Sequence, residues 1–225
     1  MAVHTSRIVL GSRSPRRLEL LSYIVSPDRI VVVPPRQTEE ADFVGLSTES
    51  AIETRLREIA RTKNEDVHSQ LTPGWQAVLT ADTTIVGWTD AGRPVVLGQP
   101  PDDDSWRAVV RGWFRDFYLG RTHAALTAVC VAVPDGRRFE RVVRSEVTFA
   151  AGGERFLEWY LATGEPRGKA GGYALQGAGS LFVERVIGSP SNVVGLPLRE
   201  TWEMLREAGV EVGFTRPPAA VYNSP

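Results

Sequence analysis

The spacing of hydrophobic residues changes along the chain, and the changes predict alternating strands and helices. Short apolar runs that end at turn-forming residues are typical of strands, and apolar residues three or four positions apart are typical of helices. Strands are expected at residues 8–10, 30–33, 77–81, 85–88, 94–97, 124–133, 141–149 and 181–187. Helices are expected from residue 14, from near residue 50, and at 102–118, 154–162 and 198–205. This order, with two hairpins, predicts an α/β fold with a mixed sheet.

Two of the predicted helices carry start signals. Ser14 suits the N-cap of the first helix, and Pro15 suits its first position, where a missing N–H costs nothing. Ser50 begins a capping-box pattern for the second helix, although Ser47 or Thr48 would serve equally well as the cap.

The remaining signals concern the later part of the chain. Acidic residues gather in the expected first turn of the 102–118 helix, where they suit the helix dipole. The glycine-rich segment 168–179 is not expected to form a regular helix, and Gly209 is expected to end the last helix. We expect one domain over residues 1–214 and a loose tail over 215–225.

Composition narrows the classes of function. The 225 residues carry a formal net charge of −1, so no overall field favours nucleic acid or a membrane surface as a partner. The single cysteine, Cys130, has no disulfide partner and lies in an apolar run. The start of the chain lacks a signal-peptide pattern, and no apolar run approaches the roughly 20 residues of a membrane span. A cytoplasmic protein is expected.

Nearly all of the basic residues are arginine. Among the 26 lysines and arginines, only Lys63 and Lys169 are lysine. A chain that otherwise uses arginine retains lysine where a compact point charge is needed. Lys63 follows Ile59 by four positions, which places it on the apolar stripe near the expected end of its helix. The alternative for Lys63 is a snorkelling side chain that stabilises the helix end.

The segment from Ser12 to Arg17 is the first candidate site. It leads from a predicted strand into a helix start, where free N–H groups favour anions. Arg16 and Arg17 add bidentate phosphate donors, although arginines in a first turn oppose the helix dipole. The pattern indicates a polyphosphate cradle.

Asp82 is the second candidate, because it directly follows the expected strand at 77–81. A carboxylate there, followed by Thr83, can hold a divalent ion or accept a proton from water, although such aspartates also cap turns. The pair Glu39 and Glu40 reads by default as a solvated loop surface.

A third candidate is the glycine-rich loop, where Lys169 could bind phosphate and Gln176 could contact a base edge. His123 is interpreted as structural, because no second histidine or cysteine accompanies it as a metal ligand.

Several motifs together resemble the Maf-like nucleotide pyrophosphatases, and the resemblance spans nearly the whole chain. They are SRSPRRLELL at 12–21, ADT at 81–83, GRTH at 120–123, KAGGYALQG at 169–177 and NVVGLPL at 192–198. Both lysines also fall where that family has lysine. The resemblance implies an enzyme that uses magnesium or manganese and water to split a nucleoside triphosphate into its monophosphate and pyrophosphate.

The resemblance also implies roles for particular residues. Asp82 matches the proton acceptor, and Glu40, or less favourably Glu39, completes the catalytic cluster with Lys63; Asp82 and Glu40 would hold the metal. Ser12, Arg17, Gln99 and Lys169 fall in the expected substrate-binding cleft, and Arg16, Thr83 and Gln176 match positions that set substrate choice. The implied fold is an elongated mixed sheet with helices on its faces and a cleft between two lobes, similar to inosine triphosphate pyrophosphatases, in a chain that often forms homodimers.

Two departures from the family pattern leave alternatives open. Gln99 stands where the family usually has a lysine, which removes a cation from the cleft, and the 102–118 segment is longer than usual. Thr83 and the ALQG sequence resemble the branch that acts on dTTP and UTP more than the branch that acts on 7-methyl-GTP. The alternatives are a catalytically weakened nucleotide-binding regulator of cell division or shape, and an enzyme that clears modified pyrimidine nucleotides.

Overall fold

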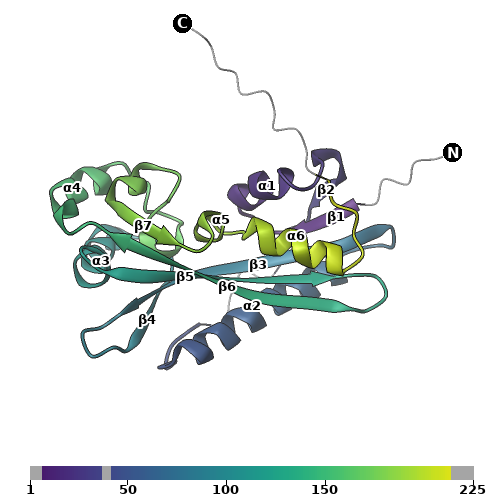
Figure 1. Ribbon diagram of the computed structural model, residues 1–225, viewed down its shortest axis with the longest axis horizontal. Coiled ribbons are helices and arrows are strands. Elements are labelled where there is room, and N and C mark those ends of the chain that lie inside the picture. The colour runs from purple at the N-terminus through teal and green to yellow at the C-terminus, as the bar shows by residue number, and fades with distance from the viewer. Residues whose placement is uncertain (1–6, 37–41, 214–225) are drawn as a thin grey trace, which may run out of the picture.

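The computed structural model describes residues 7–36 and 42–213 (Figure 1). Within these ranges, seven strands form one mixed sheet in the order β2-β1-β3-β5-β6-β7, and β4 pairs with β3. The strands are β1 Arg7–Gly11, β2 Ile30–Val32, β3 Trp75–Trp88, β4 Pro94–Leu97, β5 Thr122–Ala132, β6 Arg138–Phe149 and β7 Val183–Ile187. The α-helices are α1 Pro15–Ser22, α2 Glu49–Ser69, α3 Trp106–Trp113, α4 Glu154–Ala162, α5 Pro190–Val194 and α6 Leu198–Glu207. The predicted α/β fold with a mixed sheet and two hairpins is confirmed.

The long central strand β3 has two different neighbours on one edge. One edge pairs with β5 from Val78 to Val86. On the other edge, β1 pairs in parallel as far as Thr80, and β4 pairs antiparallel from Ile85 onward. Residues 81–84 of β3 therefore lie between the two neighbours, where the sheet opens.

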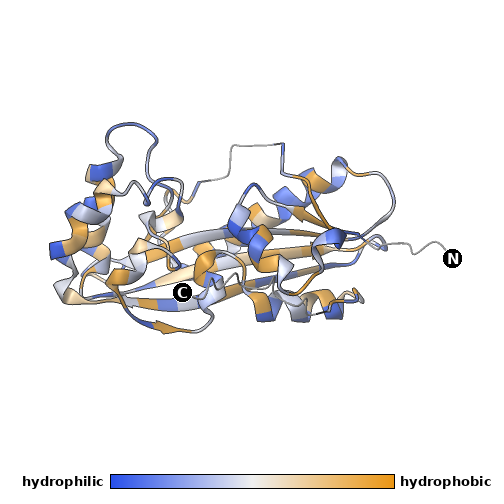
Figure 2. Cartoon of the chain, turned by 90° about the horizontal axis from the view of Figure 1, so that it is seen from above, coloured by the Kyte–Doolittle hydropathy of each residue, from blue (hydrophilic) through white to orange (hydrophobic). Residues whose placement is uncertain are grey.

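The two halves of the sheet carry separate hydrophobic cores. One core gathers β1, α1 and α6 around Leu79, and the other packs Phe114 and Phe182 against the far end of β5 and β6. Helix α2 covers the opposite face through Ile52 and Leu56. Figures 1 and 2 show this elongated arrangement, with hydrophobic and hydrophilic positions alternating along the helices. The cores form two lobes on one sheet, as the resemblance implied.

The prediction of separate strands at 77–81 and 85–88 was wrong. Strand β3 is continuous, so Asp82 lies in its middle rather than at its end. The backbone of residues 81–84 keeps its pairing with β5, so their polar side chains do not interrupt the strand. Asp82 lies beside the end of a different strand, because the neighbouring strand β1 stops at Gly11, which pairs with Thr80.

Helix α2 starts and ends differently from the main expectation. Thr48, one of the alternatives, is the N-cap, and its hydroxyl accepts a hydrogen bond from the Ala51 N–H at 3.2 Å. The helix continues to Ser69, so the prediction that Lys63 lies at its end was wrong. Buried Asn64 supports the extra turns by donating to the Val78 carbonyl at 2.9 Å.

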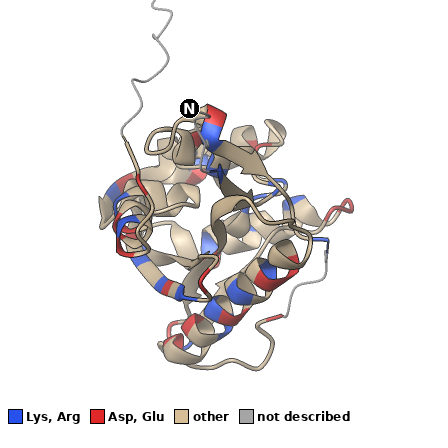
Figure 3. Cartoon of the chain, turned by 90° about the vertical axis from the view of Figure 1, so that its right-hand side faces the viewer, with Lys and Arg blue, Asp and Glu red and all other residues tan. Residues whose placement is uncertain are grey.

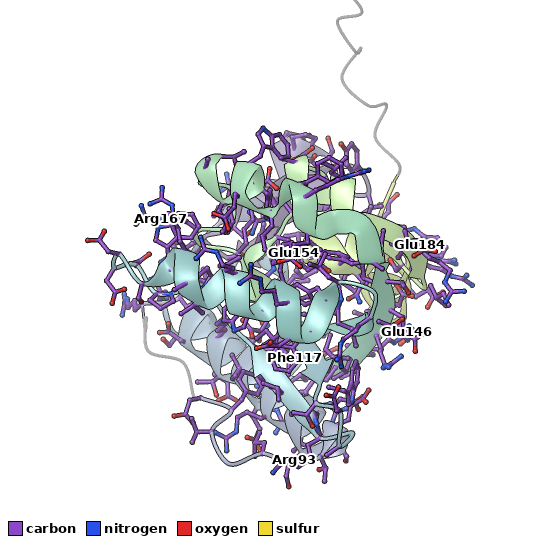
Figure 4. All side chains as sticks on the ribbon, turned by 90° about the vertical axis from the view of Figure 1, so that its left-hand side faces the viewer. Arg93, Phe117, Glu146, Glu154, Arg167 and Glu184 are labelled. Atoms are coloured by element: carbon purple, nitrogen blue, oxygen red, sulfur yellow. The ribbon has the colours of Figure 1, made fainter. Side chains whose placement is uncertain are left out.

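The 102–118 segment is helical only from Trp106, so its acidic residues do not form a first turn. The Asp103 carboxylate instead accepts from the Ser105 N–H at 2.8 Å and forms a turn ahead of the helix. After α3 the chain continues as the π-helical segment η2, Phe114–Tyr118, which buries both of its end residues. Figure 4 views this end of the molecule, with Phe117 of η2 and Glu154 at the start of α4 labelled.

The ends of α1 and α6 agree with the predicted cap positions. Ser14 is the N-cap of α1, but its hydroxyl makes no capping bond. Gly209 follows the C-cap with φ 78°, and the N–H groups of Gly209 and Val210 bond back to Arg206 and Leu205, which completes a Schellman-type end. The short helix α5 was missed, and residues 215–225 lie outside the described residues.

Phe114 gives the stability of the second core a direct test. Its ring is fully buried and contacts Tyr118, Phe149, Tyr160 and Phe182. Phe114→Ala should lower the free energy of unfolding by about 3–5 kcal/mol through lost burial and a cavity. Urea denaturation measures this, with Trp159→Ala as the control, because Trp159 is 54% exposed and its loss should cost less than about 0.5 kcal/mol. Equal effects of the two substitutions would contradict this picture of the core.

Candidate functional site

A pocket of about 630 Å³ lies at the opening between β1 and β4. Its lining comes from the β1–α1 loop, α2, the middle of β3, the end of β4, the glycine-rich loop and α5. It includes every described residue expected at the site, namely Ser12, Arg16, Arg17, Lys63, Asp82, Thr83, Gln99, Lys169 and Gln176. Glu39 and Glu40 lie outside the described residues. Arg13, which lies within the candidate segment 12–17, also lines the pocket, as do Pro35 and Phe43, which the sequence did not single out.

The pocket is strongly positive although the chain is nearly neutral. Its described lining holds five cations and one carboxylate, that of Asp82. The cations are Arg13, Arg16, Arg17, Lys63 and Lys169. Elsewhere charges of both signs are interspersed, for example along α2 (Figure 3). Cations gathered around a concave site favour a polyanion there.

Asp82 and Lys63 form an ion pair in the pocket. Lys63 Nζ lies 2.5 Å from Asp82 Oδ1, and their side chains are 15% and 11% exposed. Lys63 reaches the opening from α2, on the opposite face of the sheet from α1, and Asp82 reaches it from β3. Charges this buried are stable only when paired, so each fixes the other's position.

The β1–α1 loop is held in a fixed shape at the start of α1. The buried Ser12 hydroxyl accepts from the Ser14 N–H at 3.1 Å, and the Arg13 guanidinium donates to the Pro35 carbonyl. Residues 11–17 all line the pocket, so the N-terminal end of α1 faces it. Free N–H groups and arginines at such a helix start form the arrangement that binds phosphates.

Arg17 was expected to bind phosphate, but its guanidinium makes several bonds within the protein. Nε donates to the Gly195 carbonyl at 2.9 Å, and Nη2 donates to Thr83 Oγ1 at 3.1 Å. Thr83 Oγ1 also lies 2.9 Å from Thr127 Oγ1. These bonds connect α1, β3 and the end of α5, so Arg17 helps to hold these three elements together.

The glycine-rich loop brings Lys169 to the other side of the pocket. Burial and the nearby positive charge of Arg16 lower the pKa of Lys169 below its usual value. Gly171, with φ 72°, donates its N–H to the Gly98 carbonyl at 2.8 Å, next to Gln99. A Cβ on Gly171 would lie 2.6 Å from Ile85 and from the Tyr118 hydroxyl, so only glycine allows this approach.

The described residues contain no cluster of three His, Cys, Asp or Glu side chains that could enclose a metal ion. Asp82 is the sole carboxylate in the described lining, with the hydroxyls of Thr83 and Thr84 beside it. This donor set fits Mg²⁺, which commonly uses one or two carboxylates and completes its coordination with substrate phosphates and water.

His123 lies in the core rather than in the pocket lining. Its Nε2 is 2.9 Å from the Tyr173 hydroxyl, and burial lowers the pKa of His123 to about 3. A neutral, buried ring agrees with the structural interpretation made from the sequence.

The lowered pKa of Lys169 predicts how anion binding depends on pH. Below that pKa the ammonium is charged and attracts phosphate; as pH rises through it, the charge is lost earlier than in an ordinary lysine. Between about pH 7 and about pH 11, affinity for tripolyphosphate should fall by roughly tenfold more than in Lys169→Arg, which stays charged. Isothermal titration calorimetry measures the difference, and the ligand's own titration is common to both proteins. Parallel pH profiles would contradict a binding role for the Lys169 charge.

Comparisons with known proteins agree with the motifs. A sequence profile of the Maf-like protein family matches residues 7–208. A dTTP/UTP pyrophosphatase of Anaeromyxobacter dehalogenans (strain 2CP-1 / ATCC BAA-258) is 41% identical over 214 residues, which cover 94% of this chain and 98% of that protein. The dTTP/UTP pyrophosphatase of Brucella abortus (strain 2308) is 35% identical over 207 residues, which cover 92% of this chain and 93% of that protein.

Solved structures overlap the chain only in part. A dITP/XTP pyrophosphatase from Mycobacterium abscessus is 21% identical and gives a TM-score of 0.39, over 64% of this chain and 74% of that one. The Ham1 protein of Staphylococcus aureus is 15% identical and gives a TM-score of 0.41, over 65% of this chain and 73% of that one.

Among the helices that the structure describes, none is both long enough and apolar enough to cross a bilayer. The family profile covers most of the chain, and curated relatives align with it over nearly their full length. The resemblance seen in the motifs is confirmed, and the chain belongs to the Maf-like protein family.

Proposed function

We propose that this chain is a nucleoside triphosphate pyrophosphatase that hydrolyses dTTP and UTP to the monophosphate and pyrophosphate. The observation that carries the proposal is the Asp82–Lys63 ion pair in a pocket whose other charged residues, among those the structure describes, are arginines and Lys169. The names of the similar bacterial proteins support the choice of substrate. We further propose that it acts on free nucleotides in the cytoplasm, as a homodimer.

The positive lining suits the phosphate chain. Arg16 is close enough to Lys169 for its charge to add to the effect of burial in lowering the pKa of Lys169, and a polyphosphate would relieve that repulsion. The start of α1 supplies further N–H donors to the same pocket. The proposed role of these groups is to hold the triphosphate and stabilise the charge that develops as pyrophosphate leaves.

Asp82 is the proposed proton acceptor for the attacking water. Its ion pair with Lys63 fixes the orientation of the carboxylate, and the ammonium adds positive charge beside the reacting phosphorus. In this scheme water attacks the α-phosphorus, a new P–O bond forms, the bond to the bridging oxygen breaks, and pyrophosphate carries away the electron pair.

A divalent cation, magnesium or manganese, is the proposed cofactor. Asp82 would hold it together with the triphosphate, and Glu40, outside the described residues, is the proposed second carboxylate. When bound, it would neutralise phosphate charge.

Gln176 is the residue proposed to hydrogen-bond the base. Its amide offers a donor and an acceptor, which suits the carbonyl and N–H edge shared by thymine and uracil. Thr83, expected from the family to influence substrate choice, is held by Arg17 and Thr127, so its methyl group and position can limit the space for the base.

The proposed chemistry depends on Asp82. Asp82→Asn should reduce kcat for dTTP by at least about a hundredfold, because the amide cannot accept the proton. Pyrophosphate release with magnesium or manganese measures this across a panel of nucleotides that includes 5-methyl pyrimidines. Asp90→Asn is the matched control, because its side chain is 88% exposed in a turn. Undiminished turnover in Asp82→Asn would reject the mechanism.

Gln99 supports the second candidate, a nucleotide-binding regulator with weakened catalysis. Gln99 lines the pocket where the family resemblance expects a cation. If the chain is an enzyme, the wild type turns over, and Gln99→Lys should raise kcat/KM by about tenfold through one charge-assisted bond. Tight nucleotide binding without turnover in the wild type, with turnover appearing in Gln99→Lys, would favour the regulator instead.

A further inference from the structure

The loop that carries Lys169 and Gln176 has little regular structure to hold it in place. Between α4 and β7 it contains only two short 3-10 turns within the described chain, η4 Ala170–Gly172 and η5 Ala178–Phe182. Lys169 and Gln176 are proposed to contact the nucleotide at fixed positions. Their placement therefore depends on contacts other than the backbone hydrogen bonds of helices and strands.

Glu165 makes contacts at both ends of this loop. Its carboxylate accepts hydrogen bonds from the N–H groups of Ala178 at 2.8 Å and Gly179 at 2.9 Å, at the start of η5. Its backbone carbonyl accepts a bond from Lys169 Nζ at 2.5 Å. One residue thus joins the segment before the loop, the proposed phosphate ligand, and the turn that follows Gln176.

The surrounding groups fit closely around the Glu165 carboxylate. A Cβ on Gly177 would lie 2.2 Å from Glu165 Oε2, so the chain next to Gln176 runs directly against the carboxylate. The Tyr160 hydroxyl donates to Glu165 Oε1 at 3.1 Å and lies 3.3 Å from the Gly172 carbonyl. Burial, with the nearby Glu165 charge, raises the pKa of Tyr160, so its hydroxyl stays protonated as a donor.

The base of this arrangement is rigid. Tyr160 belongs to α4 and packs against Phe114 and Phe182 in the second core. Tyr118, in the same core, donates to the Gly171 carbonyl at 2.9 Å. Glu165 itself is absent from the described lining of the pocket, so it contacts the loop rather than the space for the nucleotide.

We propose that Glu165 is a positioning residue, whose carboxylate ties the two ends of the 165–179 loop and thereby places Lys169 and Gln176 against the nucleotide. The role of Glu165 in substrate binding rests on the proposed function. A positioning role predicts that the charge of Glu165 affects substrate affinity and base preference more than the chemical step, since Asp82 and Lys63 lie on other elements.

Glu165→Gln tests this with little change in shape. The amide keeps one acceptor oxygen, but its NH₂ group would face an N–H donor of the turn. We expect KM for dTTP to rise by about tenfold, the loss expected for one bond to a charged group. The ratio of kcat/KM for dTTP over dCTP should fall, because Gln176 loses its fixed position, while kcat changes far less than KM. NMR hydrogen exchange should become faster at the Ala178 and Gly179 amides.

Glu158→Gln is the matched control. Glu158 lies on neighbouring α4, is 68% exposed and pairs with Arg111 at 2.7 Å, so its neutralisation should leave KM and base preference unchanged. Thermal melting of both variants reports any general loss of stability.

Two results would overturn the positioning role. One is a Glu165→Gln enzyme with wild-type KM, base preference and exchange; the other is an equal loss of kcat for all nucleotides without a change in KM. A wild type that neither binds nor hydrolyses nucleotides would reject the proposed function instead. Exchange at the two amides then still tests the contact, since faster exchange supports it and unchanged exchange overturns it.

Discussion

The separation of β1 and β4 along one edge of β3 determines the rest of the site. Because β1 pairs only as far as Thr80 and β4 only from Ile85, the intervening residues of β3 face an opening instead of a neighbouring strand. Each half of the sheet has its own core, so the opening lies between two packed lobes. The loop from β1 into α1, the end of β4 and the glycine-rich loop all meet there. A sheet paired without interruption along this edge would close the opening between its two faces at residues 81–84.

The distribution of charge explains how a nearly neutral chain can bind a polyanion. Many arginines outside the pocket pair with carboxylates on neighbouring elements, as Arg61 does with Glu140 and Arg141 with Glu203. Both lysines, in contrast, line the pocket. Net charge therefore carried no information about the ligand, whereas the rarity of lysine in an arginine-rich sequence did.

Local patterns predicted most elements and most of the pocket lining, because a helix start or an apolar alternation is encoded in adjacent residues. The continuity of β3 was missed because its support comes from β5, about forty residues away in sequence. The sequence did not show that Arg17 also donates to the Gly195 carbonyl, because that bond joins segments far apart in the chain. Glu165 gave no signal, since its importance arises from how the loop folds back on it.

In the proposed reaction, water beside Asp82 attacks the innermost phosphorus of the nucleotide. The position of attack can be measured by hydrolysing dTTP in water enriched in oxygen-18 and analysing both products by mass spectrometry. Attack at the α-phosphorus should leave one labelled oxygen in the thymidine monophosphate and none in the pyrophosphate. Label in the pyrophosphate would show attack at the β-phosphorus and contradict it.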